Sequence, residues 1–401
     1  MYFSFYNIFP IVWVCLGVAV LAVLWLLIIY RSATKIRLTP SEAEEPQDGA
    51  ENALPDDLPT VSVIVYANDN AAELRRSLPE LLAQEYPQDK MEVIVVNDGS
   101  VEDVTDVVNY LSQEHHNLYL TFVPEEARNL SRKKLSVSLG VKAARNEVVV
   151  LTTAECRPVS KRWLLDMSTP FTAAGGSAAG GSKDVALGRV AITGIHSPGL
   201  RFSQAAITAT WLKAAMRRRP YRGTGFNLAY RRRLFFEVKG FSRSLNLHNG
   251  DDDIFVNQIV TRDNTAVVLT RDSLMRASFQ RADHVFRDIR LAHSFTARFL
   301  PKGARRLMGI STAMMWLWVA ATAAGCVFSL PNYFPACIFA ALIPILWIPL
   351  TVNWLRTGRA LGLKLSAPLL WWEMLWRWIS TLSCRLKCNS AKRRNYTWHH
   401  V

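Results

Sequence analysis

The amino-terminal segment of the chain is a long run of apolar residues. Residues 8–30 contain no charged side chain, and about 20 apolar residues suffice for a helix to cross a hydrocarbon core of about 30 Å. A cleaved signal peptide fits less well, because no basic residue precedes the run and Arg31, Lys35 and Arg37 follow it. We therefore predict a membrane-spanning helix whose carboxyl end lies on the cytoplasmic side, where such cations accumulate.

Two further apolar runs, at residues 307–330 and 334–355, predict a hairpin of membrane-spanning helices. Basic residues flank both outer ends of this hairpin: Arg298, Lys302, Arg305 and Arg306 precede it, and Arg356, Arg359 and Lys364 follow it. These cations place both outer ends in the cytoplasm. Residues 369–382 are apolar and rich in Trp but contain Glu373 and Arg377. We expect an interfacial helix there, because a spanning helix would leave the basic tail outside.

Between these apolar ends, strand-like and helix-like patterns alternate. Apolar runs typical of buried strands occur at residues 61–65, 92–96, 118–123 and 147–152, with amphipathic stretches between them. This alternation predicts an α/β fold with a Rossmann-like, mostly parallel sheet. Ligands of such sheets bind beyond the carboxyl ends of the strands, so Asp98 and Glu155 could face the same crevice.

Two polar segments help to divide the chain. Residues 39–59 are rich in Pro, Glu and Asp and predict a tether, while residues 172–182 are a Gly, Ala and Ser linker that could form a mobile loop over a site. The predicted divisions are an amino-terminal anchor at 1–38, the tether at 39–59, a cytosolic α/β domain at 60–300, and a membrane hairpin with an interfacial helix and a basic tail at 301–401.

The charge of the chain points to the membrane. Its formal net charge is +14 over 401 residues. No recognised nucleic-acid-binding motif accompanies the basic residues, and many of them flank apolar segments, so we expect membrane lipids and not nucleic acid as a partner. The six cysteines form no C-x-x-C pair, and we interpret them as reduced thiols of a cytosolic domain.

Six short motifs occur in order between residues 60 and 257. They are VSVIVYANDN, EVIVVNDGS, KKLSVSLG, VVVLTTAEC, YRGTGFNLAYRR and NGDDDIFVN. In this order they resemble the motifs of family-2 glycosyltransferases with the GT-A fold, of the membrane-anchored bacterial type. The resemblance implies roles for individual residues, several of which also have a simpler structural explanation.

The resemblance assigns four residues to the donor side of the site. Asp98, preceded by Asn97, resembles the aspartate turn that accepts hydrogen bonds from the nucleotide, although Asn-Asp-Gly-Ser is also an ordinary turn sequence. Lys134 matches a lysine that could neutralise phosphate charge, with a solvated helix face as the alternative. Asn227 ends a glycine-containing loop that could let the backbone approach a sugar closely.

The motif expected to bind metal departs from the family pattern. Thr153, Ala154 and Glu155 stand where the family has its D-x-D sequence. The resemblance implies a divalent cation, Mg²⁺ or Mn²⁺, that bridges the two phosphates of the donor and neutralises the departing diphosphate. Thr153 cannot supply a carboxylate, so Glu155 is the predicted metal ligand. Alternatively, Glu155 only caps a loop near Arg157.

The acidic run Asp251, Asp252 and Asp253 resembles the motif that supplies a general base for the acceptor hydroxyl. Asp252 stands where the second acid of that motif falls, so we predict that it is the base, with its two neighbours as the other candidates. Repulsion among three adjacent acids is expected to raise at least one pKa. Acidic residues also suit the amino end of a helix, so the run has a purely structural explanation as well.

One family motif is incomplete. Processive synthases of the family often carry Q-x-x-R-W on a helix at the membrane surface, but no Trp follows Arg290 in this chain. Gln280 and Arg281 do not have the required spacing either. Arg290 and His293 remain as a weak candidate contact for the diphosphate at the membrane surface.

The resemblance as a whole implies an inverting hexosyltransferase. It would move a sugar from a nucleotide donor, expected to be UDP-linked, to a lipid-linked or polysaccharide acceptor at the bacterial inner membrane, with the catalytic domain in the cytosol. A homo-oligomer or a partner in envelope polysaccharide assembly would be needed for a translocation channel. The altered D-x-D position favours an alternative, a weak or inactive glycosyltransferase-like subunit of such an assembly. A transporter is a poorer match, because too few spanning helices are predicted.

Overall fold

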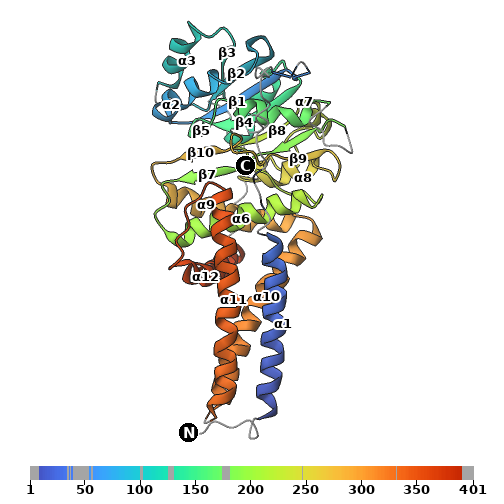
Figure 1. The fold of residues 1–401 in the computed structure, drawn as a ribbon. Coiled ribbons are helices and arrows are strands. Elements are labelled where there is room, and N and C mark those ends of the chain that lie inside the picture. Colours follow the sequence, from blue (N-terminus) through green and yellow to red (C-terminus); the bar gives the residue numbers. More distant parts are fainter. Residues whose placement is uncertain are drawn as a thin grey trace, which may run out of the picture.

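The molecule has an α/β domain at one end, a bundle of three long helices at the other, and a layer of shorter helices between them (Figure 1). The computed structural model describes residues 9–33, 36, 38, 54–55, 57–99, 103–124, 131–173, 181–245, 247–330 and 332–390. Most of the predicted tether at 39–59, the central part of the linker at 172–182 and the basic tail after residue 390 lie outside these residues.

The α/β domain is built on a seven-stranded sheet with the order β3-β2-β1-β4-β8-β6-β9. Its strands are β1 (Val61–Ala67), β2 (Met91–Asn97), β3 (Leu118–Phe122), β4 (Val148–Thr153), β6 (Val185–Leu187), β8 (Leu228–Arg231) and β9 (Thr265–Val267). The first four strands run parallel to one another, and β6 runs parallel to β9. Only β8 is antiparallel to its neighbours β4 and β6 in this sheet. The predicted α/β fold with a mostly parallel sheet is confirmed.

Three helices pack on the amino-terminal half of this sheet: α2 (Ala71–Leu82), α3 (Val104–Ser112) and α4 (Arg132–Ala143). The strands β1, β2 and β4 are buried on both faces, which explains their nearly continuous apolar sequences. Helix α4 lies very close to the sheet, because a Cβ atom added at Gly140 would stand 2.5 Å from Cγ2 of Ile64. A glycine at this position therefore fixes the distance between α4 and β1.

The rest of the domain contains a second sheet and several short helices. The second sheet has the order β5-β10-β7. Its strands are β5 (Cys156–Pro158), β7 (Val190–Thr193) and β10 (Met275–Ser278), and the helices are α5 (Trp163–Ser168), α6 (Pro198–Met216), α7 (Arg232–Glu237), α8 (Val256–Ile259) and α9 (Ala282–Thr296). A π-helical turn, η4 (Asp251–Phe255), precedes α8, and single 3-10 turns lie at Gln88–Lys90, Thr169–Phe171 and Ala297–Phe299. Helices α6 and α9 lie on the side of the domain that faces the bundle (Figure 1).

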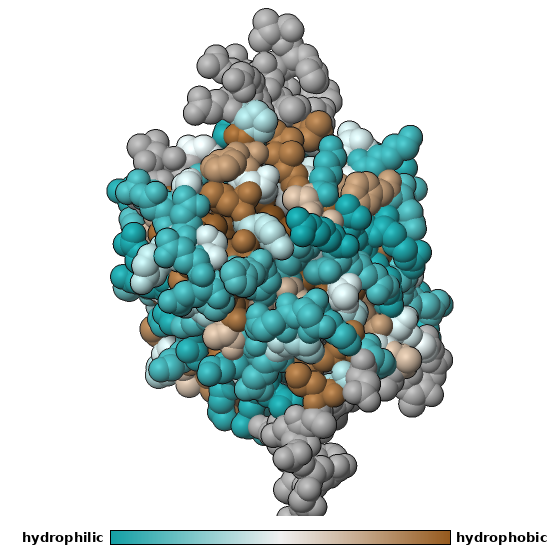
Figure 2. All heavy atoms as spheres, turned by 90° about the horizontal axis from the view of Figure 1, so that it is seen from above, coloured by the Kyte–Doolittle hydropathy of each residue, from teal (hydrophilic) through white to brown (hydrophobic). Residues whose placement is uncertain are grey.

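Three helices among the described residues are long and apolar enough to cross a membrane. They are α1 (Pro10–Ala33), α10 (Lys302–Phe328) and α11 (Tyr333–Ala360), and they coincide with the three predicted apolar runs. Helices α10 and α11 pack closely, since a Cβ atom added at Gly325 would stand 2.1 Å from the ring of Phe339. In contrast to this apolar bundle, the opposite end of the molecule is mainly hydrophilic, with a limited apolar area near one edge (Figure 2).

Helix α12 (Leu370–Ser390) covers the predicted interfacial segment. It packs on α6 and α9 and buries Leu370, Met374 and Trp378 on that side. Its other side exposes Trp371, Trp372, Ile379, Leu382 and Leu386. An apolar side left open beside a membrane bundle fits a helix that lies in the membrane surface, and this placement stays a prediction.

The carboxyl end of α11 is embedded in the α/β domain. Leu361 and Leu363, which follow the helix, are buried in the core. The fully buried guanidinium of Arg189 donates hydrogen bonds to the carbonyl oxygens of Ala360, the last residue of α11, and Thr270. A cation at a helix carboxyl end also complements the helix dipole. The α10–α11 hairpin is thus joined to the domain by a buried polar contact as well as by the chain.

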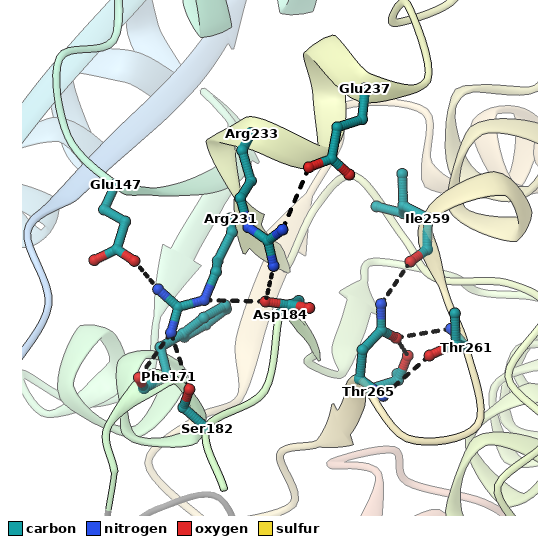
Figure 3. A network of polar contacts seen from close by, with 11 residues as sticks. Glu147, Phe171, Ser182, Asp184, Arg231, Arg233, Glu237, Ile259, Thr261 and Thr265 are labelled. Atoms are coloured by element: carbon teal, nitrogen blue, oxygen red, sulfur yellow. Dashed lines mark hydrogen bonds and ion pairs between the residues drawn. The ribbon is translucent and has the colours of Figure 1, made fainter.

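A polar network around Arg231 holds the two ends of the glycine-rich linker together (Figure 3). Arg231 Nη2 donates to the carbonyl of Phe171 at 3.2 Å and to Oγ of Ser182 at 3.1 Å. Arg231 is also the register partner of Val148, the first residue of β4. The linker therefore leaves and rejoins the domain at the amino end of β4, whereas Thr153 lies at the other end, roughly 17 Å away at the usual rise of a strand. The segment predicted as a loop over the site is anchored at the opposite end of the strand.

We expect Arg189→Met to destabilise the protein by about 2–3 kcal/mol, because it leaves buried carbonyl oxygens of Ala360 and Thr270 without their donor. Thermal or denaturant unfolding of the detergent-purified chain measures the effect. Arg217→Met is the matched control, because Arg217 is exposed, and it should change stability by less than about 0.5 kcal/mol. Equal effects of the two substitutions would contradict the role given to Arg189.

Candidate functional site

A pocket opens at the carboxyl ends of β1 and β4, beside α4. It is lined by Ile64, Tyr66, Val96, Lys133, Ser136, Val137, Leu151, Thr152, Thr153, Gly225, Phe241 and Asp251. Five of these side chains are purely apolar, and Tyr66, Lys133 and Asp251 bring a hydroxyl, an ammonium and a carboxylate to the pocket. The carboxyl edge of a parallel sheet is where ligands of such folds bind.

Asp98, which follows β2, is buried and held by two side chains. The Tyr66 hydroxyl donates to its Oδ2 at 2.9 Å, and Arg132 Nε donates to its Oδ1 at 2.7 Å. Gly99 has a φ of +64°, and a Cβ atom there would stand 2.9 Å from Nη2 of Arg132. The glycine of the predicted turn thus leaves room for this arginine. Burial, and then the charge of Asp98, raise the pKa of Tyr66, so its hydroxyl stays a donor.

The loop after β1 connects Asp98 to Glu155. Asn68 Nδ2 donates to the carbonyl of Asp98 at 2.9 Å, and Asn70 Nδ2 donates to Oε1 of Glu155 at 3.0 Å. Asp69 between them has a φ of 47°, in the left-handed region that aspartate enters at a modest cost. The structure therefore brings Asp98 and Glu155 to the same edge of the sheet. Asn97 is buried there too, with its amide 3.5 Å from Oγ1 of Thr105.

The D-x-D position offers one carboxylate. Thr153 is buried, with its hydroxyl 3.4 Å from the sulfur of Cys156, and Glu155 is half-buried. Arg157, two residues further on, pairs with Glu80. In the described part of the chain no group of three or more His, Cys, Asp and Glu side chains could hold a metal ion. These residues fit a cation that is held by one carboxylate and the phosphates of a ligand, the usual arrangement for Mg²⁺.

Asp251 is held by Lys133. Gly250, with a φ of +116°, leads into the π-helical turn that carries the acidic run. Lys133 Nζ lies 2.5 Å from Oδ2 of Asp251. Burial acts to raise the pKa of Asp251, but the charge and hydrogen bond of Lys133 and the charge of Lys134 outweigh it, and the pKa is lowered. The pKa of Asp251 is thus lowered mainly by Lys133 and Lys134. The expectation that at least one acid of the run has a raised pKa stays a prediction.

Asp253 is buried and has partners of its own. Its Oδ2 accepts a hydrogen bond from Arg222 Nη2 at 3.0 Å and another from the hydroxyl of Thr296 on α9. Both Arg222 and Asp253 are almost completely buried, so each neutralises the other. Asp252 lies between the two paired acids in the backbone, and its side chain is outside what the structure describes.

Two of the residues predicted to bind the donor have structural partners instead of lining the pocket. Lys134 is fully buried and donates to the carbonyls of Ser244, Leu247 and Asn249. Asn227 is also fully buried: its Oδ1 accepts from Trp163 Nε1 at 3.1 Å, and its amide donates to the carbonyls of Arg189 and Ser273. Their contacts with a donor stay predictions.

The two residues predicted at the membrane surface lie on α9 but have different surroundings. Arg290 Nη2 donates to Oγ of Ser380 at 2.7 Å, and its guanidinium lies 5.3 Å from the ring of Trp376, so it joins α9 to α12. Burial, and then the charges of Arg222 and Lys133, lower the pKa of His293 well below its ordinary value. His293 is therefore a neutral imidazole close to the acidic run.

Several residues of the site were not identified from the sequence. Tyr66, Arg132, Lys133 and Thr296 each hold an acidic side chain of the site. The position of Tyr66 at the end of an apolar strand and the Arg-Lys-Lys run at the start of α4 were the available signals. Thr296 gave no signal, because 43 residues separate it from Asp253.

Comparisons with known proteins agree with this arrangement. Residues 61–235 match the model of Glycosyl transferase family 2. The probable glycosyltransferase YdaM of Bacillus subtilis is 29% identical over 103 residues, which are 25% of this chain and 24% of that protein. The glycosyltransferase AglE of Haloferax volcanii is 25% identical over 107 residues, 27% of this chain and 34% of that protein. The matches thus span about a quarter and a third of these relatives.

The fold is shared with a solved structure over nearly the whole chain. The mannosyltransferase PcManGT of Pyrobaculum calidifontis, in complex with GDP-Man and Mn²⁺, superimposes with a TM-score of 0.58 at 17% identity. The match covers 96% of this chain and 99% of that one. The family predicted from the ordered motifs is confirmed. Residues 61–235 form a Glycosyl transferase family 2 domain, and the α/β domain has the GT-A fold.

Proposed function

We propose that the protein is an inverting glycosyltransferase that moves a sugar from a nucleotide-sugar donor to a lipid-linked or polysaccharide acceptor at the membrane. The observation that carries this proposal is the pocket at the carboxyl edge of the sheet, with Asp98 held next to Tyr66 and Asp251 held by Lys133. A UDP-linked sugar is the donor that the family resemblance implies. The GDP-Man bound to PcManGT makes GDP-linked sugars the second class to test.

Asp98 supports the proposal as a contact for the nucleotide. A carboxylate has about four lone-pair sites for hydrogen bonds. Tyr66 and Arg132 each use one oxygen of Asp98, and acceptor capacity remains for N–H or O–H groups of a base or ribose. Because both partners donate, they hold the carboxylate in one orientation before the donor arrives. Such preorganisation reduces the cost of binding.

The acidic run supports the proposal as the place of chemistry. Asp251 is paired with Lys133, and Asp253 with Arg222 and Thr296, which leaves Asp252 as our assignment for the base. In the proposed step Asp252 takes the proton of the acceptor hydroxyl. The acceptor oxygen then forms its bond to the anomeric carbon while the bond from that carbon to the diphosphate breaks, and the nucleoside diphosphate leaves. One displacement inverts the configuration at the anomeric carbon.

Glu155 is the residue that would hold the divalent cation together with the donor phosphates. Bound Mg²⁺ or Mn²⁺ would neutralise negative charge that develops on the departing diphosphate. Asn70 orients Glu155 through a hydrogen bond to Oε1, which leaves Oε2 available for a cation. The side chain of Thr153 adds no charge to this site.

The three apolar helices support a place in the membrane. The basic residues Lys302, Arg306, Arg356 and Arg359 lie on the segments of α10 and α11 that are near the α/β domain. By the positive-inside rule the domain then lies in the cytosol, and we propose the bacterial inner membrane. Membrane lipids are partners of the helices, and an acceptor in the same membrane would reach the domain by lateral diffusion.

We expect Asp252→Asn to lower kcat by about 100- to 10,000-fold, because it removes the proposed base. Donor affinity should stay within about two-fold, since the base acts on the acceptor. Transfer assays with UDP- and GDP-sugars, alongside calorimetric donor binding, measure both quantities. Asp263→Asn is the control, because Asp263 is exposed and pairs with Arg218 at the surface. If Asp251→Asn abolishes transfer while Asp252→Asn does not, the base is misassigned.

We expect Glu155→Gln to raise the Mn²⁺ or Mg²⁺ concentration for half-maximal transfer by at least about ten-fold, because it removes the one carboxylate at the D-x-D position. Metal titration after treatment with a chelator provides the measurement. Glu80→Gln, which changes a surface partner of Arg157, should leave the titration unchanged. Transfer that is fully retained in chelator would overturn the metal role of Glu155.

The second candidate function is a weak or inactive glycosyltransferase-like subunit of an envelope polysaccharide assembly. The buried Thr153 in place of a metal-binding carboxylate is the observation that favours it. Binding of a nucleotide sugar without transfer or hydrolysis, over a broad set of acceptors and both metals, would support this candidate over the enzyme.

A further inference from the structure

The first turn of α4 is fastened to the segment that leads into the acidic run. Lys134 Nζ donates to the carbonyl oxygens of Ser244 at 2.5 Å, Leu247 at 2.9 Å and Asn249 at 2.9 Å. Ser131 Oγ donates to the carbonyl of His248 at 3.0 Å. Four carbonyl groups between residues 244 and 249 are thus held by two side chains of one helical turn.

We propose that Lys134 is a positioning residue whose ammonium group, by holding the carbonyls of Ser244, Leu247 and Asn249, places the acidic run 251–253 at the pocket, and that this hold requires the protonated form. The proposal rests on the proposed function for its effect on transfer. It replaces the donor contact expected for Lys134, since the side chain is fully buried against backbone carbonyls.

Lys134 lies on a helix that packs against the sheet, and the segment it holds lies next to the acidic run. Gly140 lets α4 pack closely against β1. Asn249, the last carbonyl held by Lys134, is two residues before Asp251. A displacement of this segment is therefore transmitted directly to the acids. A shift of about 1 Å at a reacting group can cost on the order of 100-fold in rate.

The number of donors explains why protonation matters. An ammonium group has three N–H donors, and Lys134 meets three carbonyl oxygens. A neutral amine has only two N–H donors and would turn its lone pair toward the third carbonyl. Deprotonation therefore replaces an attraction by a repulsion at this position.

The surroundings bring this protonation into an accessible pH range. Burial lowers the pKa of Lys134 to about 8; Asp251 and Asp253 of the acidic run act to raise it, and Lys133 on the same helix acts to lower it. The unfolded chain keeps the proton of Lys134 to higher pH than the folded protein, so above pH 8 the unfolded state binds more protons. The titration of Lys134 therefore increases the free energy of unfolding as pH rises above 8. A loss of transfer above pH 8 through Lys134 would therefore not be caused by unfolding.

The test compares Lys134→Met with Lys142→Met, which changes an exposed lysine of the same helix. Transfer rate, donor affinity by calorimetry, and trypsin cleavage after the exposed Arg243 are measured at pH 7 on the detergent-purified full chain. We expect Lys134→Met to lower kcat on the order of 100-fold. Donor affinity should be unchanged, and cleavage after Arg243 should be faster, because Ser244 is no longer held. Lys142→Met should match the wild type in transfer rate, donor affinity and trypsin cleavage.

Ser131→Ala covers the case in which Lys134→Met does not fold. It removes one of the four contacts and should accelerate the same cleavage and lower kcat to a smaller extent. If Lys134→Met weakens donor binding but leaves the cleavage unchanged, Lys134 is a donor ligand and the proposal is overturned. A wild-type protein that transfers no sugar refutes the proposed function, and the cleavage rates then still decide whether Lys134 holds the segment.

The role of protonation is tested by the pH profile. Wild-type kcat should fall as pH rises through about 8. Lys134→Arg keeps a cation that does not titrate in this range, so its kcat should be lower than wild type but should lack this fall. A fall that is identical in both proteins would overturn the requirement for protonated Lys134. Tryptophan fluorescence over the same pH range verifies that both proteins stay folded.

Discussion

Three consecutive cations at the start of α4 join the two acidic parts of the site. Arg132 contacts Asp98, Lys133 contacts Asp251, and Lys134 holds the backbone before the acidic run. The side chains of adjacent residues point in different directions from a helix, so a single turn reaches both Asp98 and the acidic run. The arrangement depends on the small distance between α4 and the sheet, which Gly140 allows.

This arrangement also gives each buried carboxylate of the site a cationic partner. Carboxylates near the end of a sheet lose hydration, and a buried charge without a partner is costly. Asp98, Asp251 and Asp253 each have a cation as partner, and Asp98 and Asp253 have a hydroxyl donor as well. The cost of burying these carboxylates beside the pocket is thereby offset. Thr296 extends this pairing to α9, in the helical layer next to the bundle.

Much of the fold could be predicted from the sequence. The alternation of buried strands and amphipathic helices depends on local periodicity, and the ordered motifs added the family. The three long apolar helices could be predicted from the length of the apolar runs alone. The aspartate turn at Asp98 was identifiable because the turn and its glycine are adjacent in the sequence. These features share one property: the information lies within a few neighbouring residues.

The roles of single polar side chains were harder to predict. Lys134 and Asn227 were expected at the donor, but their directions depend on segments about 40 to 110 residues away. The acidic run suggested mutual repulsion, because the sequence does not show that Lys133 and Arg222 face it. A motif indicates which residues are near a site, while burial and distant partners decide what each one does.

The contact between Arg189 and the last carbonyl of α11 has a mechanical consequence. A helix that ended in a free linker would let the domain tilt and swing above the bilayer. Here the helix end and the two leucines around Gly362 are part of the domain interior, so the hairpin is attached to the domain through packing and a hydrogen bond as well as through the chain. The distance between the pocket and the far ends of the three long apolar helices is thereby set by the lengths of folded elements.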